Sequence, residues 1–277
     1  MKKILVTGAG GFVGARILAQ WRGAFDFCVF PSGFAAKATE ASIQQWIVQE
    51  KPDVILHTAA LSNTAYCADH PDESYRANVL LPEWVAAAAA ASGAKLLTFS
   101  SDQVYAGCTQ EGPLPETLLL SPANVYGRHK LEAEQRVLAT CPDAVLLRAA
   151  WMYDFPGYHL PIRGNLPLNL LRAFKNNTPL RFSERDFRGV SYVREVIDQL
   201  LPAMGLPGGV YNFGSGNSCN MFETASEFAR ILQIPITLEK DSWTRNLVMS
   251  GEKLATFEIR FASTQEAFCQ CLQDYGF

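Results

Sequence analysis

The stretch Lys3-Ile4-Leu5-Val6-Thr7-Gly8-Ala9-Gly10-Gly11-Phe12-Val13-Gly14 decides the fold of this chain of 277 residues. Its apolar and β-branched residues up to Thr7 predict a short strand, and residues 12–21 have the pattern of an amphipathic helix. Gly8, Gly11 and Gly14 have the spacing G-x-x-G-x-x-G of a dinucleotide-binding turn. Such a triplet also occurs in ordinary tight turns, but its place between a strand and a helix favours the dinucleotide site.

Each glycine of this turn has a distinct physical role. Gly8 makes the tight turn, Gly11 lets the backbone approach a pyrophosphate, and Gly14 lets the helix pack close to the strand. The start of the helix, with Phe12 and Val13, offers free N–H groups and a positive dipole end to phosphates.

Composition narrows the class of protein. Hydrophobic residues make up 48% of the chain, charged residues 18%, and the net charge is −3. We therefore expect a globular α/β protein with no nucleic-acid or membrane partner. Seven cysteines without a C-x-x-C pair predict reduced thiols, a cytoplasmic location and no metal site.

Strand and helix patterns alternate up to residue 150. We predict strands over 25–30, 53–57, 95–100 and 144–148, and helices over 42–50, 71–91 and 124–140, with Ser42 as a possible N-cap. This alternation predicts a Rossmann-type, doubly wound parallel sheet with helices on both faces.

The rhythm breaks after residue 150. Prolines and glycines predict a long loop over 151–167, followed by helices over 168–175, 193–201 and 222–232 and a strand over 210–213. We expect residues 1–150 to bind a dinucleotide, with about 187–213 returning to that domain. Residues 151–186 and 214–277 are expected to form a smaller α/β substrate-binding lobe.

Two further segments carry reactive side chains. Tyr126 and Lys130 lie four residues apart in a predicted helix, so the ammonium can approach the phenol and lower its pKa. Ser101 follows a predicted parallel strand, at the sheet edge where α/β proteins bind ligands. A surface tyrosine with a solvated lysine, and a serine in its own turn, are the plain alternatives.

Asn78 lies inside the predicted helix over 71–91, where asparagine is intrinsically unfavourable. Its position indicates either a water site that kinks the helix or a side chain that simply faces solvent.

Together these motifs resemble the extended short-chain dehydrogenase/reductase family, in its dTDP-4-dehydrorhamnose reductase branch. The matching segments are 8–14, 57–60, Asn78, 100–105, 126–130 and 148–153, with weaker agreement at Asn165, 186–191, Arg245 and 251–254.

The resemblance implies a catalytic role for four residues. Tyr126 would protonate the developing alkoxide, and Lys130 would hold the nicotinamide ribose and tune Tyr126. Ser101 would orient the substrate carbonyl, and Asn78 would hold a relay water.

The resemblance also implies binding residues. Ala59 and Ala60 would line the cofactor channel, whereas Asp102, Trp151, Asn165 and Arg245 would face a sugar nucleotide, with Arg245 at its diphosphate.

Two departures from the family pattern refine this expectation. Related dehydratases carry Asp-Glu after the catalytic hydroxyl residue, but this chain has Asp102-Gln103, and an amide cannot be the base for dehydration. NAD-specific relatives carry a carboxylate after the second strand. This chain has Ser32 and Lys37 there, which favours NADP(H) over NAD(H).

The sequence thus predicts a reductase that transfers hydride from NAD(P)H to a 4-keto-deoxysugar nucleotide, and the resemblance implies a homodimer. Two alternatives stay open. One is a regulatory subunit that binds a dinucleotide without catalysis, as the resemblance to the methionine adenosyltransferase β subunit suggests. The other is an epimerase that retains its NAD.

Overall fold

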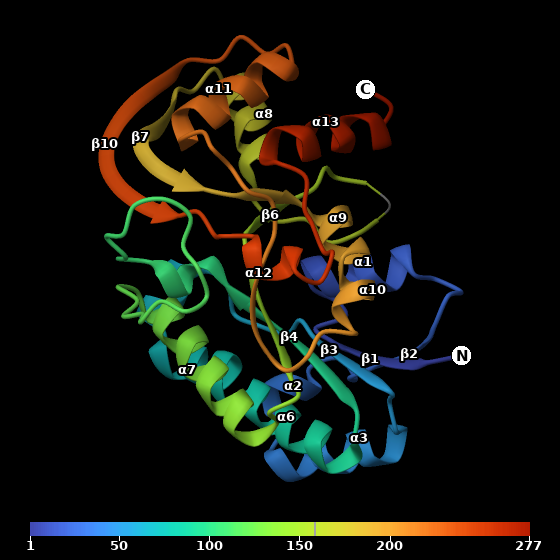
Figure 1. The fold of residues 1–277 in the computed structure, drawn as a ribbon. Coiled ribbons are helices and arrows are strands. Elements are labelled where there is room, and N and C mark those ends of the chain that lie inside the picture. The colour runs from blue at the N-terminus through green and yellow to red at the C-terminus, as the bar shows by residue number, and fades with distance from the viewer. Residues whose placement is uncertain (158) are drawn as a thin grey trace.

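The computed structural model describes residues 1–157 and 159–277, so one residue of the predicted loop over 151–167 lies outside the described part. Its centre is a sheet of six parallel strands in the order β2-β1-β3-β4-β5-β9 (Figure 1). The strands are β1 (Lys3–Thr7), β2 (Asp26–Val29), β3 (Val54–His57), β4 (Lys95–Ser101), β5 (Val145–Ala149) and β9 (Gly209–Phe213). This arrangement confirms the predicted Rossmann-type parallel sheet.

Helices cover both faces of this sheet because its strands are apolar on both sides. Ile4 and Val6 of β1 pack into one core cluster, and Leu5 between them packs into another. The first face is covered by α1 (Phe12–Gln20), α9 (Val193–Asp198), α10 (Leu200–Ala203) and α12 (Glu252–Ala255). The second face is covered by α2 (Phe34–Lys37), α3 (Glu40–Glu50), α6 (Leu81–Ser92) and α7 (Val125–Thr140).

A second group of elements lies beyond the carboxyl edge of the sheet (Figure 1). It contains two parallel strand pairs, β6 with β8 and β7 with β10, against which helices α11 and α13 pack. The elements are β6 (Trp151–Tyr153), α8 (Leu166–Asn176), β7 (Leu180–Arg188), β8 (Val190–Tyr192), α11 (Met221–Ile231), β10 (Leu238–Leu247) and α13 (Thr264–Asp274). Stacked rings of Phe228 and Phe268, 3.7 Å apart at their centres, join α11 to α13.

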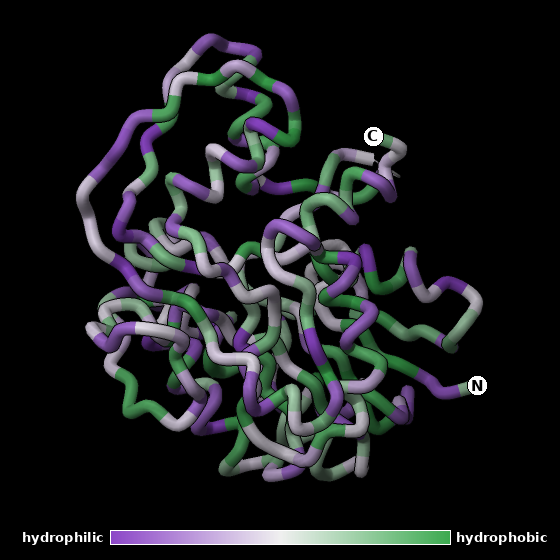
Figure 2. Tube along the Cα trace, turned by 45° about the horizontal axis from the view of Figure 1, so that its top comes forward, coloured by the Kyte–Doolittle hydropathy of each residue, from purple (hydrophilic) through white to green (hydrophobic). Residues whose placement is uncertain are grey.

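Hydropathy along the chain follows this division (Figure 2). Apolar segments gather in the body of the molecule around the central sheet, whereas polar residues are frequent along the outer arc that contains β10. Among the described residues, none of the helices is both long and apolar enough to cross a membrane.

The predicted helix over 71–91 is helical throughout, but it changes from α-helical to π-helical geometry in its middle. α4 (Thr64–Asp69) precedes α5 (Pro71–Tyr75), and a π-helical turn, η1 (Arg76–Leu80), joins α5 to α6. A π turn inserts an extra residue and often marks a functional position. Asn78 lies at its centre.

The structure corrects several local expectations. Thr39, not Ser42, is the N-cap of α3, and Ser42 completes a capping box with it. The expected helix over 193–201 is divided at Gln199 into α9 and α10. The expected loop over 151–167 contains β6. Strands β7 and β10 are not among the predicted strands, because their pairing joins distant segments.

Candidate active site

The glycine turn is shaped by close contacts. Gly8 has φ +68°, and a Cβ atom there would lie 2.8 Å from the Ala59 backbone. A Cβ at Gly14 would collide with the Gly8 carbonyl oxygen, whereas one at Gly10 would meet nothing within 4 Å. Gly11 is the N-cap of α1 and supplies no capping side chain. The first N–H groups of the helix are therefore available to a ligand.

A cleft of about 780 Å³ begins at this turn and runs along the carboxyl edge of the sheet. It is bounded by the start of α1, the segment after β3, the ends of β4 and β5, the face of α7, and residues 161–164. Of the predicted site residues, it is lined by Gly11, Phe12, Val13, Ala60, Ser101, Asp102, Tyr126, Lys130, Trp151 and Arg245.

Ser101 and Tyr126 meet in this cleft. Ser101 ends β4 and caps the short 3₁₀ helix η2 (Asp102–Tyr105), where its hydroxyl accepts the N–H of Gln103 at 3.2 Å. It also donates a hydrogen bond of 3.1 Å to the Asp102 carboxylate. Tyr126 is 6% exposed, near the start of α7. Ser101 and Tyr126 thus line the same cleft, Ser101 from the end of β4 and Tyr126 from the start of α7.

Burial is the largest influence on the pKa of Tyr126. Burial raises the pKa of Tyr126, while the nearby Ser101 hydroxyl and the charge of Arg163 oppose the shift. The expectation that Lys130 would lower this pKa is therefore corrected, because the net shift is upward. The Lys130 Nζ atom lies 5.9 Å from the centre of the Tyr126 ring.

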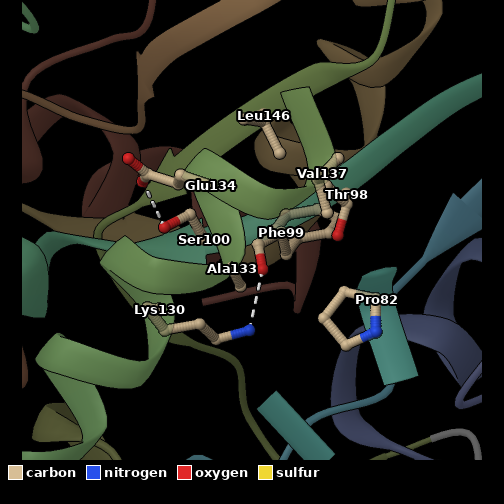
Figure 3. A pocket seen from close by; sticks show the side chains of 9 residues that line it. All are labelled: Pro82, Thr98, Phe99, Ser100, Lys130, Ala133, Glu134, Val137 and Leu146. Carbon is tan, nitrogen blue, oxygen red and sulfur yellow. Dashed lines mark hydrogen bonds between the residues drawn. The ribbon is translucent and has the colours of Figure 1, made fainter. Parts of the chain in front are cut away.

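Lys130 is held from behind the cleft (Figure 3). Its ammonium donates a hydrogen bond of 2.9 Å to the Phe99 carbonyl oxygen of β4. Burial lowers the pKa of Lys130 to about 8, and the charge of Glu134, one turn further along α7, opposes that shift.

Glu134 belongs to a buried polar network beside this lysine (Figure 3). Its carboxylate accepts a hydrogen bond of 2.5 Å from Ser100. It also accepts two from Arg148, at 3.0 and 2.7 Å. Both side chains of the ion pair are 4% exposed. The network ties β4, β5 and α7 together directly behind Ser101 and Lys130.

Asn78 is fully buried and engaged with backbone. Its Oδ1 atom accepts the N–H of Leu61 at 3.2 Å, and its Nδ2 atom donates to the Leu61 carbonyl at 2.9 Å and to the Ser74 hydroxyl at 3.1 Å. It is not a solvent-facing residue. Asn78 fixes the segment after β3 that forms one lip of the cleft.

Some predicted cofactor residues lie outside the lining of the cleft, among them Gly8 and Gly14 of the turn itself. Ser32 is exposed in the turn after β2, and Lys37 is exposed at the end of α2. Ala59 packs against Gly8, and its N–H donates to the Thr7 hydroxyl at 3.3 Å.

The lining of the cleft also contains Arg188, an arginine for which the sequence predicts no role. Arg188 donates to the Asp102 carboxylate at 2.6 Å, and its guanidinium lies 5.0 Å from the centre of the Trp151 ring. Asp102 is therefore held by an ion pair beside Ser101. The segment 186–191 agrees with the family pattern, but nothing in its local sequence indicates a partner 86 residues away.

The side chains of Arg245 and Asn165 both form hydrogen bonds within the protein. Arg245 makes two hydrogen bonds, of 2.8 and 2.7 Å, to Asp186, while it still lines the cleft. Asn165 has no exposed surface, does not line the cleft, and caps α8 by accepting the N–H of Leu168 at 3.1 Å. The structure thus places Asn165 behind the wall, so direct contact with a substrate does not follow from its position.

This chain is similar in sequence to a known protein family and to several of its characterised relatives. A family model described as the RmlD substrate binding domain matches residues 1–245. The spore coat polysaccharide biosynthesis protein SpsK of Bacillus subtilis is 24% identical over 82% of this chain and 78% of its own length. The dTDP-4-dehydrorhamnose reductase of Mycolicibacterium smegmatis is 34% identical over 55% of this chain and 46% of its own length.

A solved structure has the same fold over nearly the whole chain. The crystal structure of dTDP-4-dehydrorhamnose reductase from Bacillus anthracis, in complex with NADP, superposes with a TM-score of 0.89. It is 20% identical and is matched over 99% of each chain.

Proposed function

We propose that this chain, which belongs to the RmlD substrate binding domain family, is an NAD(P)H-dependent reductase of a 4-keto-deoxysugar nucleotide. It is an oxidoreductase of the short-chain dehydrogenase/reductase type. One observation carries the proposal. Ser101, Tyr126 and Lys130 line the same cleft as the glycine turn at the start of α1.

The turn fits a dinucleotide because it presents backbone where side chains would interfere. The close approach of Gly14 to Gly8 brings the free N–H groups of α1 to the cleft floor, where they favour a diphosphate. When bound, NAD(P)H supplies the hydride for reduction of a carbonyl.

Tyr126 then has the role of acid. As hydride reaches the carbonyl carbon, the carbonyl oxygen takes the Tyr126 proton, and the C–O group becomes an alcohol. A phenol whose pKa is raised by burial is reliably protonated before this step. Ser101 would turn its hydroxyl from Asp102 to the carbonyl oxygen, and Lys130 would hold the nicotinamide ribose.

We further propose a role for Asn78 away from the substrate. Because its amide is engaged with Leu61, the Asn78 side chain supports the lip of the cleft, and a relay water would be held by backbone groups of the π turn.

Most of the second group of elements forms the proposed substrate side; the exceptions to the bounds below are β8, which lies in that group, and α12, which packs on the central sheet. We assign the dinucleotide to residues 1–150 with about 187–213, and the sugar nucleotide to 151–186 and 214–277. Trp151, Asp102 and Arg245 then face the sugar nucleotide, while Asn165 positions the loop behind them. The relatives' names support dTDP-4-keto-6-deoxy-L-mannose as the substrate.

NADP(H) is the proposed preference between the two cofactors. No carboxylate follows β2 before α2, and Ser32 and Lys37 are exposed there. A 2′-phosphate therefore meets no repulsion and has a hydroxyl and an ammonium nearby.

The seven free thiols support a cytoplasmic location. We also propose that the chain forms a homodimer, and light scattering in solution tests this.

The test is oxidation of NADPH and of NADH, followed by absorbance, with dTDP-4-keto-6-deoxy-L-mannose. The proposal predicts consumption that depends on the keto-sugar and is faster with NADPH at limiting cofactor. Absence of consumption with both cofactors, in a preparation shown to bind them, would overturn the reductase assignment.

A further inference from the structure

Arg163 reaches across the mouth of the cleft. It belongs to the segment between β6 and α8, yet its guanidinium lies 4.9 Å from the centre of the Phe12 ring at the start of α1. Its Nη1 atom donates a hydrogen bond of 3.0 Å to the Ser62 hydroxyl, in the segment after β3. One side chain from the lobe therefore contacts two segments that border the dinucleotide half of the cleft.

Hydrogen bonds hold the segment that carries Arg163 in place, both before and after that residue. Arg16 of α1 is buried, pairs with Asp154 at 2.6 Å and donates to the Pro161 carbonyl at 2.7 Å. The Asn165 amide donates to the Asp154 carbonyl at 2.9 Å and to the Arg163 carbonyl at 3.3 Å. Arg163 is thus placed over α1 in advance, so little conformational entropy is lost when it binds a ligand.

Its charge is uncompensated in the part of the chain that the structure describes. Three arginines line the cleft. Arg188 is paired with Asp102 and Arg245 with Asp186, but no carboxylate within 4 Å pairs with Arg163. The Nε atom of Arg163 is also buried without a hydrogen-bond acceptor among the described residues. A partly buried guanidinium with spare donors is costly unless an anion completes it.

We propose that Arg163 binds a diphosphate, that of the dinucleotide, from the side opposite the N-terminus of α1. The inference rests on the proposed function and adds to it a cofactor-binding residue from the substrate lobe. The helix N-terminus and the guanidinium then enclose the anion from two sides. Cofactor binding would thereby also fasten the lobe segment over the cleft.

The test compares ligand affinities of the wild-type chain with those of Arg163→Met. The probes are NADPH, ADP-ribose, AMP and dTDP, titrated without keto-sugar. ADP-ribose has the diphosphate but no nicotinamide, AMP has no diphosphate, and dTDP represents the sugar nucleotide. Arg172→Met, an exposed arginine on α8 outside the cleft, is the matched control, and circular dichroism checks the fold of both variants.

We expect Arg163→Met to weaken NADPH and ADP-ribose by about tenfold or more, with AMP and dTDP nearly unchanged. Arg163→Lys keeps the charge but loses the planar fork, so its affinity is expected to be intermediate. Unchanged affinity for ADP-ribose would overturn the proposal, and so would a loss confined to dTDP. A wild-type chain that binds no dinucleotide would instead refute the proposed function.

Discussion

The two walls of the cleft are built by different means. The sheet-side wall, with Gly11, Ser101, Tyr126 and Lys130, follows from local rules: strand ends, a tight turn and the spacing of one helix. The lobe-side wall is held by ion pairs between segments far apart in the sequence, such as Arg188 with Asp102. The contrast indicates that the chemistry is set by regular structure, and that the recognition surface is set by long-range charge pairing.

The largest expected effect is on the sheet-side wall. Tyr126→Phe removes the proposed proton donor and should lower kcat by about 10²–10⁴-fold, with the NADPH affinity nearly unchanged. Tyr66→Phe, at an exposed hydroxyl that bonds Glu73, is the control. Turnover of Tyr126→Phe close to wild type would remove the chemical distinction between the walls.

The second effect is on stability. Glu134→Ala leaves the buried Arg148 charge without its carboxylate and should lower the free energy of unfolding by about 3–5 kcal/mol. Glu227→Ala, which breaks the exposed pair with Arg230 on α11, should leave that free energy nearly unchanged. Equal denaturation midpoints for the two variants would show that the buried network does not support the sheet-side wall.

The glycine turn allows a matched pair of smaller changes. Gly14→Ala places a Cβ against the Gly8 carbonyl and should cost about 1–3 kcal/mol in stability, with weaker dinucleotide binding. Gly10→Ala meets no atom within 4 Å and should have little effect on either quantity. Similar losses in both variants, in thermal unfolding and titration, would contradict the close-packing account of the turn.

The smallest effect concerns pH. The pKa of Lys130 is lowered to about 8, so its ammonium is present below that pH and is lost above it. The Kd for NADPH should therefore rise as the pH passes upward through about 8. Lys175→Met, at an exposed site, should keep this dependence, whereas Lys130→Met should bind weakly at all pH values. A pH-independent Kd in the wild-type chain would contradict the assigned role.

The sequence was sufficient for the parallel sheet and for the residues that line its carboxyl edge. Strand periodicity and the glycine spacing depend only on neighbours in the chain. It was not sufficient for β7 and β10, whose pairing joins residues about 60 apart, or for the placement of Arg163 and Arg188. The direction of the Tyr126 pKa shift was also missed, because burial is a property of the packed structure rather than of helix spacing.

The most direct measurement of the central claim is the transfer of a labelled hydride. The chain would be incubated with dTDP-4-keto-6-deoxy-L-mannose and with NADPH that carries deuterium at both C4 positions of the nicotinamide. The mass of the sugar nucleotide would then be measured by mass spectrometry. The account predicts a reduced sugar with a single deuterium at the former carbonyl carbon. Recovery of unreacted keto-sugar, from a chain that binds NADPH tightly, would contradict it and favour a dinucleotide-binding regulatory subunit.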